Sequence, residues 1–141
     1  MSTSTRALAL VSGAGIGPEI ARLLARDGYD VVATGRSDAI SAAAIQLRAE
    51  GAVVYPVQAD LARREGVEAV WQAVLDTGRP LEVAVLNAGR SIGGAFTDTD
   101  LDDQLAMIAL NVTSVVHLAK RVTRHMVQRL TAGSSSPRRC P

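Results

Sequence analysis

The chain has 141 residues, of which 48% are hydrophobic, enough for one domain with a packed core. Its formal net charge of +1 gives no general case for nucleic acid, and no apolar run reaches the length of a membrane span. The single cysteine, Cys140, permits no internal disulfide and fits a cytoplasmic protein, and with so few Cys and His residues no metal site is expected.

The first predicted elements are a buried strand at residues 7–11 and a helix that begins near Pro18. Between them stand Gly13, Gly15 and Gly17. A strand, a glycine turn and a helix N-terminus together form a geometry that holds phosphate. The spacing is not G-x-G-x-x-G, because proline occupies the position of the last glycine. These residues alone therefore leave two interpretations open, a nucleotide site and a plain structural turn.

Strands and helices alternate through the rest of the chain. Strands are predicted at residues 30–34, 52–57 and 83–86, and helices at 39–50, 65–76 and from 101 to about 130. Alternation of this kind is typical of an α/β fold with a doubly wound parallel sheet of the Rossmann type. Right-handed crossovers give the strand order 3-2-1-4. We expect an incomplete dinucleotide-binding domain at residues 1–130 and an irregular tail at 131–141.

Polar and small residues follow each predicted strand, in segments 12–17, 35–37, 60–61 and 87–89. In an open parallel sheet, ligands bind beyond the carboxyl ends of the strands, where the strand order reverses. The alternative is that turn residues simply occupy turns. The convergence of four such segments on one edge favours a binding site.

The residues at these positions resemble the short-chain dehydrogenase/reductase family over roughly residues 6–130. The resemblance rests on the order and separation of four motifs: Ser12-Gly13-Ala14-Gly15-Ile16-Gly17, Asp60-Leu61, Asn87-Ala88-Gly89 and Asn111. It implies hydride transfer between a nicotinamide cofactor and a small-molecule alcohol or ketone, and a homo-oligomer for an intact family member. From the net charge and the lack of a long apolar run, we expect no nucleic-acid or membrane partner.

The resemblance also implies roles for individual residues. Cofactor-binding residues would be Ser12, Gly13, Ile16 and Gly17 at the pyrophosphate, Asp60 and Leu61 at the adenine, and Asn87, Ala88 and Gly89 along the central wall. Asn111 would be the asparagine of the catalytic tetrad, which holds a proton-relay water through its backbone.

The cofactor preference depends on Arg36 and Ser37, which follow the second predicted strand. An acidic residue there would accept the ribose 2′-OH of NAD, whereas a guanidinium suits a 2′-phosphate. The alternative is a solvated loop arginine. We expect NADP in preference to NAD.

Two features depart from the family pattern. First, the glycine turn is two residues shorter than Thr-Gly-x-x-x-Gly-x-Gly. Second, the chain has no Tyr-x-x-x-Lys pair: the residues four positions after Tyr29 and Tyr55 are Ala33 and Ala59, and the residue four positions before Lys120 is Val116. The serine of the tetrad is also missing. The sequence therefore predicts the truncated, cofactor-binding N-terminal part of an oxidoreductase, inactive by itself. The alternatives are a non-catalytic dinucleotide-binding or interaction module and a broken gene product.

The remaining candidates are two histidines and the tail. His117 and His125 lie on the last predicted helix, where packing or solvent-facing roles are favoured over that of a general base. Residues 134–141 fit no element of the fold, and one choice of codons in a shifted frame gives an apolar run followed by small hydroxyl residues. We therefore interpret the tail as a frameshift product rather than a natural terminus.

Overall fold

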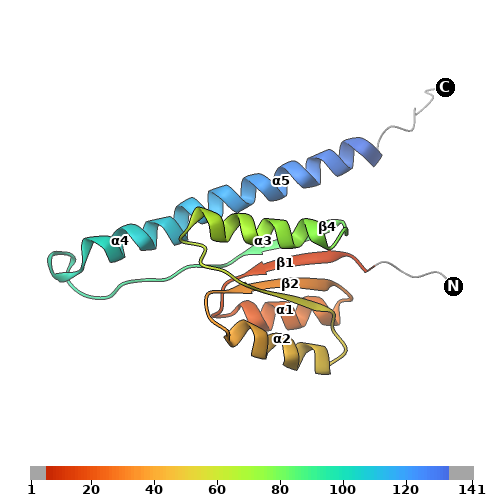
Figure 1. Ribbon diagram of the computed structural model, residues 1–141, viewed down its shortest axis with the longest axis horizontal. Coiled ribbons are helices and arrows are strands. Elements are labelled where there is room, and N and C mark those ends of the chain that lie inside the picture. Colours follow the sequence, from red (N-terminus) through yellow and green to blue (C-terminus); the bar gives the residue numbers. More distant parts are fainter. Residues whose placement is uncertain (1–5, 134–141) are drawn as a thin grey trace.

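The computed structural model describes residues 6–133 as a single parallel sheet with helices on both faces (Figure 1). Its strands lie in the order β3-β2-β1-β4, which confirms the predicted fold class and strand order. The elements in chain order are β1 (Leu8–Ser12), α1 (Gly17–Arg26), β2 (Asp30–Gly35), α2 (Ala39–Ala49), β3 (Val54–Gln58), α3 (Arg64–Asp76), β4 (Leu81–Leu86), a 3-10 turn (Phe96–Asp98), α4 (Leu101–Ile108), a π-helical segment (Ala109–Thr113) and α5 (Ser114–Gly133).

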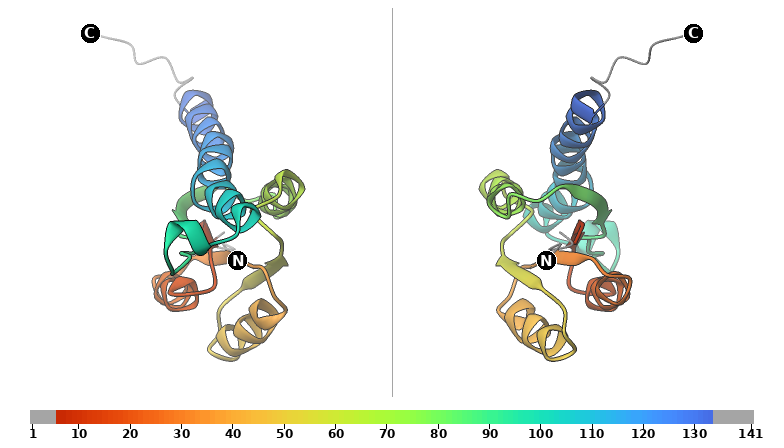
Figure 2. Two further views of the ribbon diagram at one scale, coloured as in Figure 1. Left: turned by 90° about the vertical axis from the view of Figure 1, so that its left-hand side faces the viewer. Right: turned by 90° about the vertical axis from the view of Figure 1, so that its right-hand side faces the viewer.

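The two faces of the sheet are covered by different pairs of helices (Figure 2). Helices α1 and α2 pack on one face, where Val31, Ala44 and Val54 are buried. Helices α3 and α5 cover the other face, where Leu10, Trp71 and Leu118 are among the core residues. Strands β1 and β2 are buried along their whole length, as expected for central parallel strands. This rigid centre fixes the positions of the loops that leave β1 and β2.

Apart from one-residue shifts at other ends, the structure departs from the predicted elements in four places. Strand β3 spans Val54–Gln58, where we expected residues 52–57. Strand β4 begins at Leu81, two residues earlier than expected, because the fully buried Leu81 pairs with Leu8 of β1. The predicted single long helix is divided by the π-helical segment Ala109–Thr113. Helix α5 also continues through Thr131, which we expected to begin the irregular tail. The Thr131 hydroxyl donates to the carbonyls of Val127 and Gln128, 3.3 and 2.9 Å away, as the helix continues. Residues 134–141, on which the frameshift interpretation rests, lie outside the described residues.

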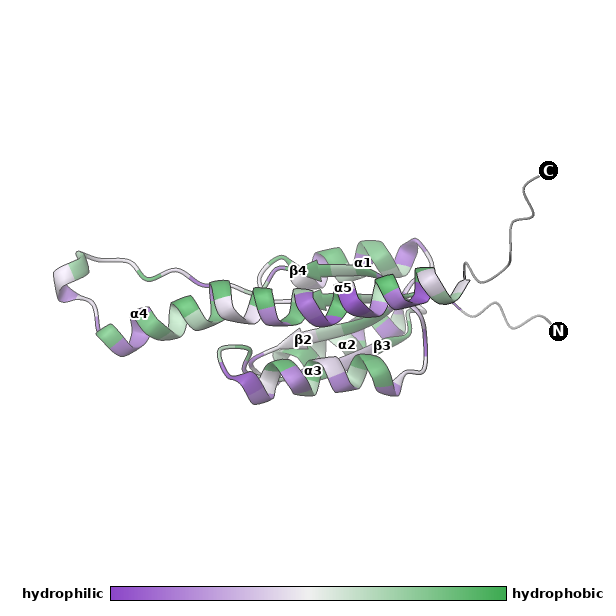
Figure 3. Cartoon of the chain, turned by 90° about the horizontal axis from the view of Figure 1, so that it is seen from above, coloured by the Kyte–Doolittle hydropathy of each residue, from purple (hydrophilic) through white to green (hydrophobic). Residues whose placement is uncertain are grey.

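The C-terminal helical stretch also extends past the sheet (Figure 3). By length and composition alone, Leu101–Gly133 is long and apolar enough to cross a membrane, which the sequence prediction did not anticipate. One such helix is weak evidence, because a core helix of a soluble protein meets the same criterion. Here Leu118 and Val122 of α5 are buried against the sheet layer, so we assign the stretch to the fold.

Candidate functional site

A cavity of about 590 Å³ lies where the carboxyl ends of the four strands meet. All four segments predicted to converge contribute to it. The lining residues are Gly13, Ala14, Gly15, Ile16, Thr34, Gly35, Arg36, Ala59, Asp60, Leu61, Ala62, Asn87, Ala88, Gly89, Arg90, Asp103, Ala106 and Leu110. The size and the mixture of apolar walls with a few polar groups are typical of a small-molecule site.

The glycine turn after β1 forms one wall of the cavity. Gly13 has φ +102°, and a Cβ atom built on it would lie 3.0 Å from the backbone of Asn87 and Ala88. A side chain at this position is therefore disfavoured both by the backbone conformation and by the close contact. No side chain caps the N-terminus of α1, so the first N–H groups of that helix are available to an anion. Gly17 is the first residue of α1; it is buried and is not among the residues that line the cavity, so its contact with a cofactor stays a prediction.

Ser12, at the end of β1, lies beneath the cavity and does not line it. Its side chain is buried, and its Oγ accepts hydrogen bonds from the N–H groups of Asn87 and Ala88, at 3.1 and 3.3 Å. The hydroxyl thus joins the ends of β1 and β4 and holds the Asn87-Ala88-Gly89 segment against the glycine turn. This explains how two motifs 75 residues apart come together. A direct contact between Ser12 and a cofactor stays a prediction.

The segment after β2 supplies a guanidinium to the cavity. Arg36 is exposed and lines the cavity next to Gly35, while the neighbouring Ser37 is exposed and does not line it. Gln58 of β3 donates to the Arg36 carbonyl at 3.3 Å, which ties this turn to the adjacent strand. The lining residues from the end of β2 include no carboxylate.

The segment after β3 places Asp60 and Leu61 in the cavity wall. Asp60 Oδ1 accepts the N–H of Ala62 at 3.0 Å, and its carbonyl accepts the N–H of Arg63 at 3.1 Å. Gly66 in the first turns of α3 lies so close that a Cβ there would overlap the Asp60 carbonyl. Sequence reasoning missed Gly66, although a glycine inside an amphipathic helix is itself a signal of close packing.

Asn111 lies in the π-helical segment and clamps the residue after the Asn87-Ala88-Gly89 motif. Its Oδ1 accepts the Arg90 N–H at 2.9 Å, and its Nδ2 donates to the Arg90 carbonyl at 2.7 Å. Asn111 does not itself line the cavity. π-Helical turns are frequent at functional sites. The catalytic role of Asn111 stays a prediction.

Helix α4 forms a wall that the sequence analysis did not predict. Asp103, Ala106 and Leu110 line the cavity at intervals of three and four residues, so they share one face of the helical stretch. The helical periodicity of this stretch was visible in the sequence. Which face of this helix lines the cavity depends on the path that residues 87–100 take from β4, and no local sequence pattern specifies that path.

The two histidines lie outside the cavity lining. His117 Nε2 lies 2.6 Å from Glu68 Oε1, and Arg121 Nη2 lies 2.7 Å from the same oxygen. The hydrogen bond from Arg121, followed by that with His117, lowers the pKa of Glu68. His125 packs edge-on against Trp71, with ring centres 5.6 Å apart. Both histidines therefore join α5 to α3.

Comparison with known proteins decides the family. The family model described as short chain dehydrogenase matches residues 7–134. The chain belongs to the short-chain dehydrogenase family. This confirms the resemblance drawn from the motifs and places the chain in a family of oxidoreductases.

Individual members of the family are similar over most of this chain. The probable oxidoreductase EphD of Mycobacterium tuberculosis is 31% identical over 123 residues, which cover 86% of this chain and 21% of that protein. L-sorbose reductase from Gluconobacter frateurii, solved with NADPH and L-sorbose, is 29% identical with a TM-score of 0.81, covering 88% of this chain and 49% of that one. A short-chain dehydrogenase from Sphingobium yanoikuyae, solved with NADPH, is 33% identical with a TM-score of 0.79, and the match covers 87% of this chain and 50% of that one. The chain thus spans half or less of the length of these three relatives.

Proposed function

We propose that residues 6–133 form the dinucleotide-binding half of a short-chain oxidoreductase, with NADP preferred to NAD. The observation that carries the proposal is the single cavity formed by the glycine turn, Arg36, Asp60-Leu61 and Asn87-Ala88-Gly89. The cavity fits such a cofactor because it combines an uncapped helix N-terminus with a close-approach glycine. When bound, the dinucleotide supplies the hydride chemistry of the family.

Each segment has a distinct role in the proposal. The N–H groups at the start of α1 bind the pyrophosphate, and Asp60 and Leu61 contact the adenine. Arg36 binds the 2′-phosphate through charge-assisted hydrogen bonds, which the neutral ribose hydroxyl of NAD cannot match. Solved relatives that contain NADPH support this preference.

The preference is tested by titration calorimetry with adenosine 2′,5′-bisphosphate and with AMP, which differ by the 2′-phosphate. We expect the bisphosphate to bind about tenfold more tightly, the value of one charge-assisted contact at a partly exposed site. Arg36→Ala should remove that difference and leave AMP unchanged. Arg63→Ala, which removes an exposed guanidinium outside the cavity lining, is the matched control. Equal affinities for the two ligands in the parent chain would contradict the role of Arg36.

A second candidate function is dinucleotide binding without catalysis, favoured by the absence of a Tyr-x-x-x-Lys pair from this sequence. In the family, lysine lowers the pKa of the tyrosine so that it can exchange a proton near neutrality. We therefore expect no oxidation of alcohols or reduction of ketones by this chain with either cofactor. Turnover above the blank that persists after rigorous removal of host dehydrogenases would contradict this expectation and show that the chain itself is catalytic.

A further inference from the structure

Helix α4 forms a wall of the cavity, and at its C-terminal end it continues through the π-helical segment Ala109–Thr113 into α5, which packs in the core. No residue of α4 is buried, and Leu101 and Leu105 are more than half exposed. Figures 1 and 3 show it projecting past the end of the sheet. Its cavity-facing residues are nevertheless Asp103 and Ala106, followed by Leu110 just beyond its end. Because α4 has no buried face, its N-terminal turns depend on contacts other than core packing to keep this wall in position.

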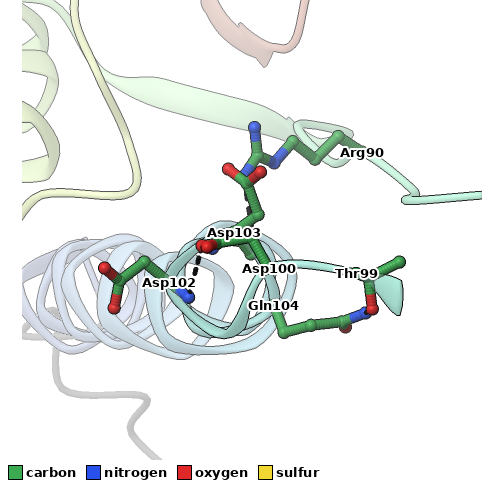
Figure 4. Close-up of polar contacts among 6 residues, drawn as sticks. All are labelled: Arg90, Thr99, Asp100, Asp102, Asp103 and Gln104. Atoms are coloured by element: carbon green, nitrogen blue, oxygen red, sulfur yellow. Dashed lines mark hydrogen bonds and ion pairs between the residues drawn. The ribbon is translucent and has the colours of Figure 1, made fainter. Parts of the chain in front are cut away.

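Arg90 supplies that attachment (Figure 4). Its Nη2 donates to the main-chain carbonyl of Asp103 at 3.2 Å and lies 3.6 Å from the Asp103 carboxylate. The Asp103 side chain is 65% exposed, so the ion pair alone is weak. The bond to the carbonyl is different in kind, because it holds the helix backbone itself at a point on the cavity wall.

Both ends of this link are fixed. The Arg90 main chain is held at its N–H and at its carbonyl by Asn111. The first turn of α4 is ordered by Asp100, whose side chain accepts the N–H groups of Asp102 and Asp103 at 2.8 and 3.2 Å. The guanidinium therefore connects the ordered segment after β4 to the ordered first turn of α4, and both line the cavity.

We propose that Arg90 is a positioning residue that holds α4 as a wall of the ligand cavity. The proposal rests on the proposed function, since the ligand whose fit it controls is the dinucleotide. Arg90 acts through α4, because it keeps Ala106 and Leu110 in the cavity wall, where they can contact the bound dinucleotide. Loss of its side chain loosens the α4 end of this helical stretch and leaves the sheet intact.

The test compares the parent chain with Arg90→Met, which keeps most of the aliphatic stem, and Arg90→Lys, which keeps a charged donor. Arg124→Met removes an exposed guanidinium of α5 outside the cavity and is the control. Hydrogen exchange is measured without ligand at the amides of residues 105–110. We expect exchange about three- to tenfold faster in Arg90→Met, as for one partly exposed charge-assisted hydrogen bond. Arg90→Lys should lie between, and the control and the amides of β1 should not change.

NADPH binding and urea unfolding complete the test. We expect Arg90→Met to weaken NADPH binding about two- to fivefold at an unchanged unfolding midpoint, which a general structural role would not produce. Parent-like exchange in Arg90→Met overturns the proposal, and so does faster exchange with parent-like NADPH affinity. If the parent chain binds no NADPH, the proposed function fails, and the exchange measurement alone decides whether Arg90 holds α4.

Discussion

Gly13 and Gly15 stand in the same turn, but the structure predicts a large loss of stability when Gly13 is replaced by alanine and little change when Gly15 is. Gly13 has φ +102°, and a Cβ there would lie 3.0 Å from the Cα and N atoms of Ala88. Gly15 has no positive φ, and a Cβ there would meet nothing within 4 Å. The pair therefore isolates backbone strain and close contact from the general loss of a glycine.

The magnitudes follow from these two terms. Holding alanine at a positive φ costs about 1–2 kcal/mol, and forcing a methyl group against an immobile backbone costs about 1–3 kcal/mol. Gly13→Ala should thus lower the free energy of unfolding by about 2–5 kcal/mol, a large share of the 5–15 kcal/mol typical of a domain. Gly15→Ala should change it by less than about 1 kcal/mol, with stabilisation possible because alanine restricts the unfolded chain.

Urea unfolding followed by circular dichroism measures both changes, with the m-value as the check that the denatured state is the same. The contact with Ala88 also predicts a local effect, because Ser12 holds the same segment. Amides of residues 87–90 should exchange faster in Gly13→Ala than in Gly15→Ala. Equal losses in the two variants, or a loss below about 1 kcal/mol in Gly13→Ala, would refute the reasoning.

Three further predictions concern other parts of the chain. Gly66→Ala should destabilise the fold or displace the loop at Asp60, because the new Cβ overlaps the Asp60 carbonyl; calorimetric melting should detect it, and an unchanged Tm would contradict the close approach. The pKa of Glu68 is lowered by Arg121 and His117, so its ionised carboxylate stabilises the fold at pH values above the ordinary pKa of glutamate. This contribution is lost as the pH falls through the lowered pKa of the folded state. Glu68→Gln should therefore lower the Tm at neutral pH and converge with the parent in acid; a constant difference across the pH range would exclude this linkage. Finally, β4 pairs only with β1 among the described residues, so its other edge is open and should promote self-association that increases with concentration. A monodisperse monomer in light scattering, with cooperative unfolding, would show that the edge is protected.

Much of the fold could be predicted from the sequence because the signals were local. The apolar runs in β1 and β2 and the glycine turn each specify structure within a few residues, and the right-handed crossover rule then gives the strand order. The π-helical segment could not be predicted, since one wider turn hardly disturbs a helical hydrophobic pattern. The boundaries of β3 and β4 shifted because strand ends depend on pairing with neighbours.

The candidate site was predictable to the same degree. Strand ends converge by topology, so the sequence alone places Gly13, Arg36 and Asp60 at one edge of the sheet. The α4 wall could not, because its position depends on the side chain of Arg90 and on a long connection. Gly66 shows the same limit: its presence in a helix was visible, but its contact with Asp60 required the structure.

The walls of the cavity therefore differ in how firmly they are held. The glycine turn and the segments after β2 and β4 extend from strands buried in the sheet or are tied to them by Ser12. The α4 wall depends on Arg90 and Asn111, at the exposed end of the molecule. Ligand groups that contact only the strand ends should bind with an affinity that is insensitive to α4, whereas groups that reach Ala106 and Leu110 should bind only as tightly as α4 is held. In the proposed binding mode, adenosine 2′,5′-bisphosphate contacts the strand ends and NADPH also reaches α4, so we expect the ratio of their affinities to report the order of α4 separately from the charge at Arg36.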